Sequence, residues 1–383
     1  MKEHNVIQLE AFQAGNREKS PTGYTYFVPE RINAHWSWND QQINTLLEKA
    51  AIRLGELNSF ARLVPNIDLF IQLHVTKEAV VSSRIEGTQT RVDEAFLSEE
   101  EVLPERRNDW KEVNNYIKAL NYAIEELKNL PISSRLLRQV HRMLLDSVRR
   151  EFKQPGDFRT SQNWIGGSSP SDAVFVPPHH QYVNELMGDL ENFLHNDDLN
   201  VPALVRIAIA HYQFETIHPF LDRNGRIGRL LITLFLVDQQ ILAKPLLYLS
   251  SYFEKDKALY YDNLTFVRTR NDMTQWIRYF LMGLAETAQK ASETLSNVLV
   301  LKARIENEIN QKLGRKSHTA TILLNYLFQK PIVHVREVEE ATGLSYKAAN
   351  VLVADFMSLG ILKEMTGQSR NRVFVMAEYV DLF

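Results

Sequence analysis

Residues 218–229, HPFLDRNGRIGR, are the feature that most constrains the fold and the chemistry of this 383-residue chain. Directly after them, residues 230–237 form an unbroken apolar run, LLITLFLV. Together the two segments predict a polar loop that leads into a buried helix, with Gly225 near the helix start. The N-terminus of a helix has unpaired backbone N–H groups and a partial positive charge, so it suits a phosphate group.

The side chains in this stretch also suit phosphate chemistry. Arg226 and Arg229 lie three residues apart, would share one helix face and could both donate paired hydrogen bonds to phosphate oxygens. Asp222 is placed to hold Mg²⁺, and His218 to accept a proton from an incoming hydroxyl group. These residues together indicate nucleotide-dependent phosphoryl or nucleotidyl transfer. The alternative is a solvated loop that caps a core helix through Asp222 or Asn224.

The stretch resembles the signature of the Fic family, HxFx(D/E)GNGRxxR. Most members of that family transfer AMP from ATP to a Ser, Thr or Tyr hydroxyl group of a protein. The matching residues are His218, Phe220, Asp222, Asn224, Gly225, Arg226 and Arg229. Arg223 departs from the pattern, because it stands where the family usually has its first glycine, which permits a closer approach of the backbone to the phosphates. Gly225 keeps the second glycine, which the phosphate-transferring Doc toxins replace with lysine, and this favours AMP transfer.

The resemblance implies a site for ATP and Mg²⁺ in this chain. His218 is the expected catalytic base and Asp222 the expected metal ligand. The expected nucleotide-binding residues are Arg223, Asn224, Gly225, Arg226, Ile227, Gly228, Arg229 and Tyr261. Tyr261 is included because the pair Tyr260–Tyr261 lies where many relatives carry two tyrosines near the adenine, on which an aromatic ring could stack. The alternative is an ordinary helix that buries one ring and exposes the other.

Residues 82–87, SSRIEG, resemble the inhibitory motif of the same family, (S/T)xxxE(G/N). Ser82, Glu86 and Gly87 match it. In relatives the glutamate reaches the second signature arginine, here Arg229, and occupies the space of the γ-phosphate. The resemblance therefore implies an enzyme that holds itself inactive through Glu86. The alternative is a Glu86 that projects into water or pairs with Arg84.

The composition is that of an ordinary globular chain, with 44% hydrophobic and 24% charged residues. A net charge of −3 gives no sign of binding to nucleic acid or to an anionic membrane. The absence of cysteine excludes disulfides, thiol catalysis and cysteine-ligated zinc. We expect no signal peptide, no membrane span and a cytoplasmic location. For His179 and His180, considered with His211, a wet loop is favoured over a metal site, because no acidic partner is suitably spaced.

The hydrophobic periodicity predicts a mainly α fold in three parts. Residues 1–110 would form an amino-terminal helical region, in which residues 1–40 are an irregular arm. Residues 111–314 would form a Fic catalytic domain with a β-hairpin flap, and residues 315–383 a small α+β winged-helix domain. Helices are expected at 40–63, 68–87 (the inhibitory helix), 110–130, 134–146, 182–194, 202–214, from the signature to 240, 251–268 and 273–314.

Residues 155–178 are rich in turn-forming residues and predict a β-hairpin. Short β-prone pieces lie around Trp164–Ile165 and residues 173–176. In the Fic family the flap at this place is thought to hold the target segment as an added strand, which aligns a peptide through its backbone. The resemblance therefore implies a target protein that presents its hydroxyl group along residues 155–178. Self-modification and a homodimer are further options, and an ordinary surface hairpin is the alternative.

Residues 315–383 read as three short helices, at 319–328, 336–342 and 345–359, and a hairpin formed by residues 363–365 and 373–376. This is the order of a winged-helix domain, which accompanies many bacterial Fic proteins. The third helix offers only Lys347 as a base, opposed by Asp355, whereas Arg370 and Arg372 on the wing could contact a phosphate backbone. A protein contact or a packing role is favoured at least as much as weak DNA contact.

Two other functions remain open at this point. One is a transcription regulator that senses ATP through its Fic domain and binds DNA through the winged helix. The other is a Fic enzyme of a different reaction, either AMP removal or the transfer of phosphate or phosphocholine. ATP-responsive, specific DNA binding would indicate the first, and the mass added to a modified protein would distinguish the second from AMP transfer.

Overall fold

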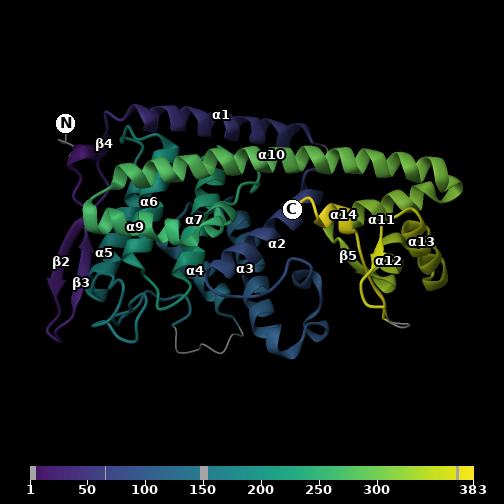
Figure 1. The fold of residues 1–383 in the computed structure, drawn as a ribbon, viewed down its shortest axis with the longest axis horizontal. Helices are drawn as coiled ribbons and strands as arrows, with labels where there is room; N and C mark the ends of the chain where they lie inside the picture. Colours follow the sequence, from purple (N-terminus) through teal and green to yellow (C-terminus); the bar gives the residue numbers. More distant parts are fainter. Residues whose placement is uncertain (1–5, 65, 147–153, 368–370) are drawn as a thin grey trace.

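The computed structural model describes residues 6–64, 66–146, 154–367 and 371–383, and its fold is mainly α-helical. The longest element, α10 (Met273–Lys312), runs along most of the length of the molecule (Figure 1). Helix α1 (Gln41–Leu63) lies beside it, and the carboxy-terminal elements gather at its far end (Figure 1). The expected mainly α fold class is confirmed.

Helix α1 shows how local sequence signals lead to packing. The Asp40 carboxylate accepts a hydrogen bond from the Ile43 N–H at 2.8 Å and caps the first turn, and Arg278 of α10 pairs with the same carboxylate. The buried residues of α1 are spaced three or four apart and include Ile43, Leu46, Ala50, Leu54 and Leu57. This stripe packs against α10, so the helix predicted at 40–63 is confirmed.

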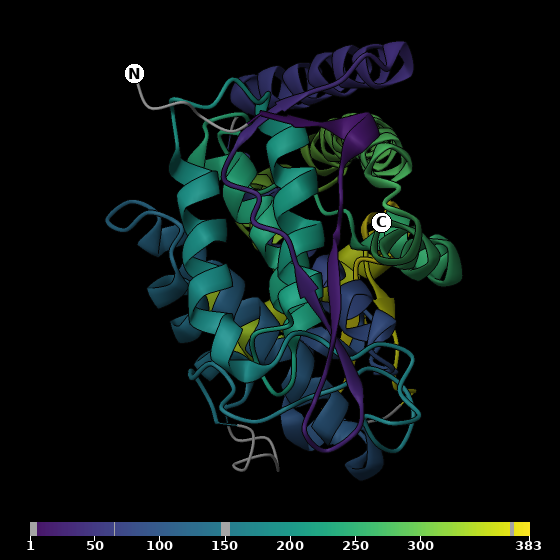
Figure 2. The same ribbon diagram turned by 90° about the vertical axis from the view of Figure 1, so that its left-hand side faces the viewer.

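The signature lies among helices whose bounds agree with the sequence-based predictions to within a few residues. These helices are α3 (Arg107–Glu126), α4 (Ser134–Leu144), α5 (Val183–His195), α6 (Ala203–Ile217) and α7 (Asn224–Asp238). Helices α6 and α7 are buried along nearly their whole length and pack against each other. They form the centre of the catalytic region, because α6 also contacts α1, α5 and α10, and α7 also contacts α2 (Asp68–Ile85), α3 and α4. In Figure 2 the purple amino-terminal strands pass in front of the teal helices of this region. The apolar run after the signature is therefore a core helix, as predicted.

One predicted helix is wrong. A single helix was expected at 251–268, but the chain forms α8 (Ser250–Lys255) and α9 (Lys257–Arg270). Asp256 separates them with φ −141° and ψ 81°, and its carboxylate accepts a hydrogen bond from the Leu259 N–H at 2.9 Å. The side chain of Asp256 thus caps a new helix in place of continuing the old one, which is a common role of aspartate.

Helix α2 (Asp68–Ile85) connects the regions of the molecule, since it packs against α3, α8 and α11. It is buried on several sides, with Phe70, Leu73 and Val80 fully covered. Gly87 follows its end with φ +101°, a left-handed conformation that glycine adopts without strain. The predicted helix and its terminating glycine are confirmed.

The irregular arm expected at residues 1–40 is wrong. The described part of this segment contains β1 (Val6–Gln8), β2 (Gly15–Lys19), β3 (Thr25–Pro29) and β4 (His35–Ser37). Strands β1 and β4 are parallel, and β2 and β3 form an antiparallel hairpin. The strands have only three to five residues, too few to show a period in the sequence.

The carboxy-terminal region contains the helices and strands expected there, together with one more strand, β5, and one more short helix, α14. They are α11 (Ser317–Gln329), β5 (Ile332–His334), α12 (Val335–Thr342), α13 (Tyr346–Ser358), β6 (Lys363–Glu364), β7 (Val373–Val375) and α14 (Ala377–Val380). The sheet order is β5–β7–β6, all antiparallel. Arg370, expected on the wing, lies outside the described residues. The domain boundaries at 110 and 314 and the name winged helix stay predictions.

Short 3₁₀ helices complete the described elements. They are Leu9–Ala11, Glu94–Phe96, Glu99–Glu101, Pro104–Arg106, His180–Tyr182 and Gly314–Lys316.

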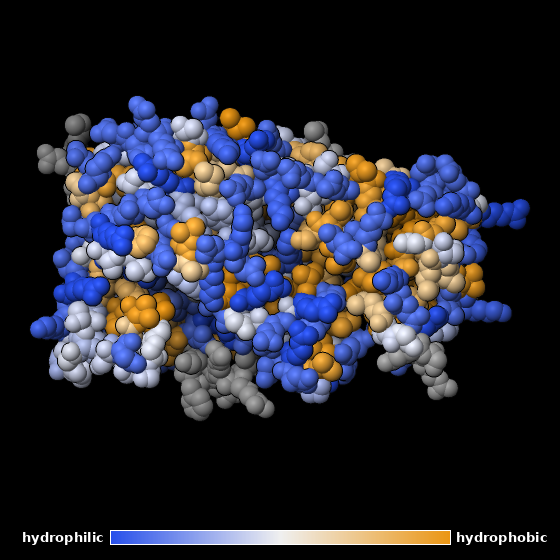
Figure 3. Space-filling model, in the orientation of Figure 1, coloured by the Kyte–Doolittle hydropathy of each residue, from blue (hydrophilic) through white to orange (hydrophobic). Residues whose placement is uncertain are grey.

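None of the helices in the part of the chain that the structure describes is both long and apolar enough to cross a bilayer. Figure 3 shows that polar side chains cover most of the left-hand half of one face, whereas apolar ones gather on the right-hand half, around the carboxy-terminal elements.

Two substitutions in α1 test this packing. Leu57 is fully buried, so Leu57→Ala should lower the free energy of unfolding by about 2–5 kcal/mol, measured by urea denaturation. Ile52, in the same helix, is 53% exposed, so Ile52→Ala should change it by about 0.5 kcal/mol or less. Equal effects of the two substitutions would show that the buried face of α1 is assigned wrongly.

Candidate active site

His218 stands at the end of α6 in a left-handed backbone conformation, with φ 50° and ψ 61°. This turn directs the chain out of the core helix and into the signature loop. Arg159 and Asn163 hold the loop, because Arg159 Nε donates to the His218 carbonyl at 2.9 Å and Asn163 Nδ2 donates to the Phe220 carbonyl at 2.8 Å. Arg159 is 2% exposed. No local pattern indicated these two residues, because they act on backbone groups about 55–60 positions away.

Arg223 and Asn224 form the start of α7. The Asn224 side chain accepts a hydrogen bond from the Phe220 N–H and donates one to the Phe220 carbonyl, both at 2.8 Å, and so closes the loop. The cap that we considered, by Asp222 or Asn224, is wrong: Arg223 precedes the helix, with φ 63°, and no side chain caps it. A left-handed arginine costs roughly 1–2 kcal/mol. The backbone thus adopts the conformation that the usual glycine would favour.

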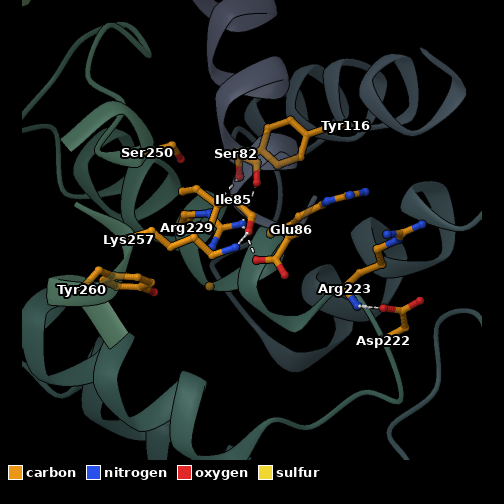
Figure 4. Close-up of polar contacts among 12 residues, drawn as sticks. Ser82, Ile85, Glu86, Tyr116, Asp222, Arg223, Arg229, Ser250, Lys257 and Tyr260 are labelled. Carbon is orange, nitrogen blue, oxygen red and sulfur yellow. Dashed lines mark hydrogen bonds and ion pairs between the residues drawn. The ribbon is translucent and has the colours of Figure 1, made fainter. Parts of the chain in front are cut away.

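The Arg229 guanidinium is buried and binds the end of α2 (Figure 4). Its Nε donates to Ser82 Oγ at 2.9 Å, and its Nη2 donates to the Ser82 carbonyl and to Glu86 Oε1 at 2.9 and 2.8 Å. The contact expected between Glu86 and Arg229 is therefore present. The alternative partner for Glu86 is wrong, because Arg84 pairs with Glu254.

The Glu86 carboxylate lies directly against the first turn of α7. A Cβ atom added to Gly225 would lie 2.5 Å from Glu86 Oε1, so only a glycine leaves room for this carboxylate. Burial raises the pKa of Glu86, but the charge of Arg229 outweighs burial and keeps the pKa below its usual value. Lys257 donates to the Ile85 carbonyl and adds a second cation at this helix end. Glu86 is thus ionised and occupies the place where an anion would meet the helix N-terminus.

Glu112 of α3 joins the two remaining arginines of the site. It pairs with Arg223 and, at 2.8 Å, with Arg226, and all three side chains are buried. Two nitrogens of Arg226, Nε and Nη1, have no partner among the described residues. Sequence reasoning missed Glu112, although a glutamate beside Val113 and one turn before Tyr116 on a buried face was a usable signal. The acid neutralises part of the arginine charge and leaves Nε and Nη1 of Arg226 without a partner among the described residues.

Burial sets the protonation of the groups around His218. It lowers the pKa of His218 to about 4, with help from the charges of Arg159 and Arg268, so the imidazole is neutral at pH 7. Its Nδ1 lies 3.4 Å from the Glu215 carbonyl. Burial also raises the pKa of the Glu215 side chain to about 7, and its Oε1 lies 2.1 Å from the place that a Cβ of Gly228 would occupy. Glu215 is a second acid that sequence reasoning missed.

Of the tyrosine pair, Tyr260 is buried and Tyr261 is 38% exposed. The Tyr260 hydroxyl is 3.0 Å from His211 Nε2, and His211 Nδ1 is 2.8 Å from the Gly228 carbonyl. His211 is therefore a buried residue of α6 that supports α7. The charges of Glu86 and Arg229 act on the Tyr261 hydroxyl and so place this ring beside the site. Ile227, another expected nucleotide contact, is fully buried in the core.

The hairpin expected at residues 155–178 is reduced to one antiparallel pair. Ile165 and Phe175 exchange two backbone hydrogen bonds, of 2.8 and 3.1 Å, and the residues between them form turns. Phe175 packs against Phe27 of β3 and lies under the Arg268 guanidinium, whereas Trp164 is 39% exposed. The Gly and Pro residues of the tip favour turns over a longer ladder.

Asp222 is the expected metal ligand, and its Oδ1 accepts a hydrogen bond from the Arg223 N–H at 2.9 Å. Within the described ranges, no cluster of three or more His, Cys, Asp or Glu side chains could hold a metal ion. A cation at Asp222 would therefore depend on oxygens from a bound phosphate and from water, which is how Mg²⁺ is commonly held at nucleotide sites.

Comparisons with known proteins agree with this geometry. Residues 44–125 match the Fic/DOC family N-terminal model, and residues 131–236 match the Fic/DOC family model. The chain thus contains a Fic/DOC family N-terminal domain followed by a Fic/DOC family domain. The resemblance to the Fic family, stated from the signature, is confirmed. Glu112 lies within the N-terminal match.

Two curated relatives illustrate the similarity. A probable protein adenylyltransferase of Aquifex aeolicus is 26% identical over 176 residues, which cover 46% of this chain and 52% of the relative. The protein adenylyltransferase fic-1 of Caenorhabditis elegans is 30% identical over 122 residues, covering 32% and 22%. The matched part of the chain thus spans about half, or less, of the length of each of these relatives.

Solved structures share the fold at low identity. A Fic family protein from Desulfovibrio desulfuricans has a TM-score of 0.55 at 20% identity, covering 88% of this chain and 96% of that one. A Fic domain containing signaling protein from Bacteroides thetaiotaomicron has a TM-score of 0.53 at 20% identity, covering 66% and 96%.

The buried trio of Glu112, Arg223 and Arg226 has a measurable role in stability. Glu112→Gln leaves two buried guanidinium groups without their carboxylate, so we expect the free energy of unfolding to fall by about 3–5 kcal/mol at pH 7. Glu105→Gln, the same change at an exposed glutamate, is the control and should have little effect.

The pH dependence of that loss tests its electrostatic origin. Burial raises the pKa of Glu112, but Arg226 and Arg223 lower it below its usual value. The stabilisation is therefore complete above the unfolded pKa of about 4.3 and is lost as pH falls through the lower folded pKa. The difference between wild type and Glu112→Gln should be constant from about pH 5 to 8 and shrink below about pH 4. A difference that does not change with pH would contradict this account.

Proposed function

We propose that this chain transfers AMP from ATP to a Ser, Thr or Tyr hydroxyl group of a protein, and that Glu86 holds the reaction off. The observation that carries the proposal is the start of α7, an uncapped helix N-terminus with buried arginines and a neutral imidazole beside it. The names of the relatives, protein adenylyltransferases, support the same reaction.

The phosphates of ATP bind at the first turn of α7. Backbone N–H groups at Asn224 and Gly225 donate to them, because no side chain caps this helix end. Nε and Nη1 of Arg226, buried without partners among the described residues, add two charge-assisted donors. Tyr261, half-buried beside the cluster, offers a ring face to the adenine.

Asp222 would hold Mg²⁺, with phosphate oxygens as the other ligands. The carboxylate fits this role, since Mg²⁺ in nucleotide sites commonly takes one or two protein carboxylates and completes its shell with phosphate and water. When bound, the ion neutralises charge that develops on the leaving pyrophosphate.

His218 accepts the proton of the target hydroxyl. The contact of its Nδ1 with the Glu215 carbonyl favours the tautomer that carries hydrogen on Nδ1, which leaves Nε2 as the base. The hydroxyl oxygen forms a bond to the α-phosphorus as the bond between that phosphorus and the bridging oxygen to the β-phosphate breaks. The proton passes to the imidazole, and pyrophosphate leaves with the electron pair of the broken bond.

The target peptide lies along residues 155–178. Ile165 and Phe175 use their backbone groups on each other, and Val174 beside them is 81% exposed. A peptide added at this edge is held by its backbone, which would accept different side chains around the modified hydroxyl.

Glu86 inhibits the enzyme from within the chain. Its carboxylate holds Arg229 and covers Gly225, so a triphosphate cannot use either group while Glu86 stays in place. In the proposed division of the chain, this helix belongs to the amino-terminal region 1–110, the transfer site to 111–314, and a winged-helix domain to 315–383.

The role of His218 leads to a direct test. His218→Ala should reduce AMP transfer by about 100-fold or more and leave ATP binding nearly unchanged, because the imidazole acts on the proton and not on the phosphates. Transfer is followed with ATP radiolabelled at the α-phosphate, and binding by calorimetry. ATP labelled at the γ-phosphate is the control for phosphate transfer. Full activity of the variant would refute the mechanism.

The role of Glu86 requires a comparison of rates at equal protein and ATP concentrations. Glu86→Gly should raise transfer, including transfer onto the protein itself, by about tenfold or more, since it frees Arg229 and the first turn of α7. Glu105→Gly, an exposed matched control, should behave as wild type. Arg229→Ala should not imitate Glu86→Gly, because it also removes a phosphate ligand. A folded Glu86→Gly variant with wild-type or lower transfer would exclude Glu86 from the mechanism.

A further inference from the structure

Helix α2 lies between the signature site and the carboxy-terminal region, near the middle of Figure 1. The end of this helix binds Arg229 through Ser82 and Glu86, whereas its first turns pack against α11. The helix is continuous over 18 residues, which gives it a length of about 27 Å. The catalytic helices and the carboxy-terminal region therefore act on the same rigid element.

Aromatic rings join α2 to the carboxy-terminal region. Phe70 of α2 meets Phe328 of α11 edge to face, with ring centroids 5.2 Å apart, and Phe328 meets Tyr379 of α14 at 4.8 Å. Tyr379 meets Phe383 at 5.6 Å, and the Phe383 ring lies 4.6 Å from that of His74, one turn after Phe70 on α2. Edge-to-face contact is a preferred geometry of aromatic pairs. We call these five residues the aromatic cluster.

The aromatic cluster is buried and is supported by hydrogen bonds. Phe328 and Tyr379 are fully buried, and His74 is 7% exposed. The Tyr379 hydroxyl donates to the Phe328 carbonyl at 3.1 Å, and Lys77 of α2 donates to the Phe383 carbonyl. Burial lowers the pKa of His74 to about 3, so its ring is neutral at pH 7 and packs as an aromatic group. The contact between α2 and the carboxy-terminal region is thus part of the core.

The contacts of α2 follow one row of side chains from the aromatic cluster to the signature site. Residues four apart are neighbours on a helix surface, so they form a continuous row. The first two members of the row belong to the aromatic cluster, the third accepts hydrogen bonds from α3 and α8, and the last two bind Arg229. The row consists of Phe70, His74, Glu78, Ser82 and Glu86.

We propose that the carboxy-terminal region sets the strength of the inhibition by Glu86, through the aromatic cluster. The cluster and the contact between Glu86 and Arg229 require the same position of α2, so each stabilises the other. When the cluster loosens, α2 loses its support at the first turns, and the population in which Glu86 has left Arg229 increases. The effect on AMP transfer rests on the proposed function, whereas the mechanical coupling does not.

Phe328 is the position at which to test the coupling, because its ring contacts both Phe70 and Tyr379. Phe328→Leu keeps an apolar side chain and removes the ring contacts. Phe356→Leu is the matched control: it makes the same change at another fully buried phenylalanine of the region, on α13, whose main contacts are with α12.

Amide hydrogen exchange measures the hold on α2 without catalysis. Phe328→Leu should speed exchange at residues 82–86 by about fivefold or more, and Phe356→Leu should leave it within about twofold of wild type. If Phe328→Leu does not fold, Lys77→Met, which removes the bond to the Phe383 carbonyl, takes its place and should speed the same exchange. Unchanged exchange at residues 82–86 in the folded variant, or an equal change in Phe356→Leu, overturns the coupling.

Linkage gives a reciprocal measurement, because coupling between two contacts acts in both directions. Glu86→Gly should speed exchange in α11, far from the substitution, whereas Glu105→Gly should not. Exchange in α11 that is the same in Glu86→Gly and wild type overturns the proposal.

AMP transfer onto the protein itself then tests the consequence for activity. Phe328→Leu should raise it by about fivefold or more over wild type, and should cause no further rise in the Glu86→Gly background, where no carboxylate is left to displace. A further rise in that background overturns the proposal, since the effect would not pass through Glu86. Absence of transfer in every variant, with the exchange changes present, refutes the proposed function and leaves the coupling standing.

Discussion

The buried guanidinium of Arg229 and its partners on α2 are the contacts on which the arrangement of the site depends. Arginine stays charged in proteins, and a buried charge that loses its partner costs several kcal/mol. Ser82 and Glu86 meet this requirement here, so the end of α2 is held against α7. A nucleotide phosphate could replace the Glu86 carboxylate without leaving Arg229 unpaired. The exchange of one anion for another is therefore energetically feasible, although loss of both is not.

A second buried charge group explains how this chain accommodates an arginine where the family usually has glycine. Arg223 adopts the left-handed conformation that glycine would take, and its guanidinium turns to Glu112. The ion pair offsets the strain of that backbone conformation. Glu112 also holds Arg226, so a single carboxylate on α3 orients two signature side chains.

Helix α2 connects the site with the rest of the molecule, because it packs against other elements on several sides. Its last turn contacts Arg229, and along its length it packs against α8 and against α11 of the carboxy-terminal region. A rigid helix transmits a displacement along its whole length, so contacts at any of these places bias the position of Glu86. Contacts outside the catalytic helices can therefore affect the position of Glu86.

Local signals in the sequence determined most of the helices, the signature loop and the inhibitory motif. A cap such as Asp40, an apolar spacing of three or four, and a terminating glycine such as Gly87 act within one or two turns. Apart from Tyr261, the site residues that were predicted lie in two short segments for the same reason. Only the tertiary structure revealed Glu112, about 110 residues before its partners, because charge pairing across such a separation depends on how helices pack. It likewise decided the short strands β1 to β4 and the reduced flap, since pairing of a few residues is stabilised by the surfaces around them and not by their own pattern.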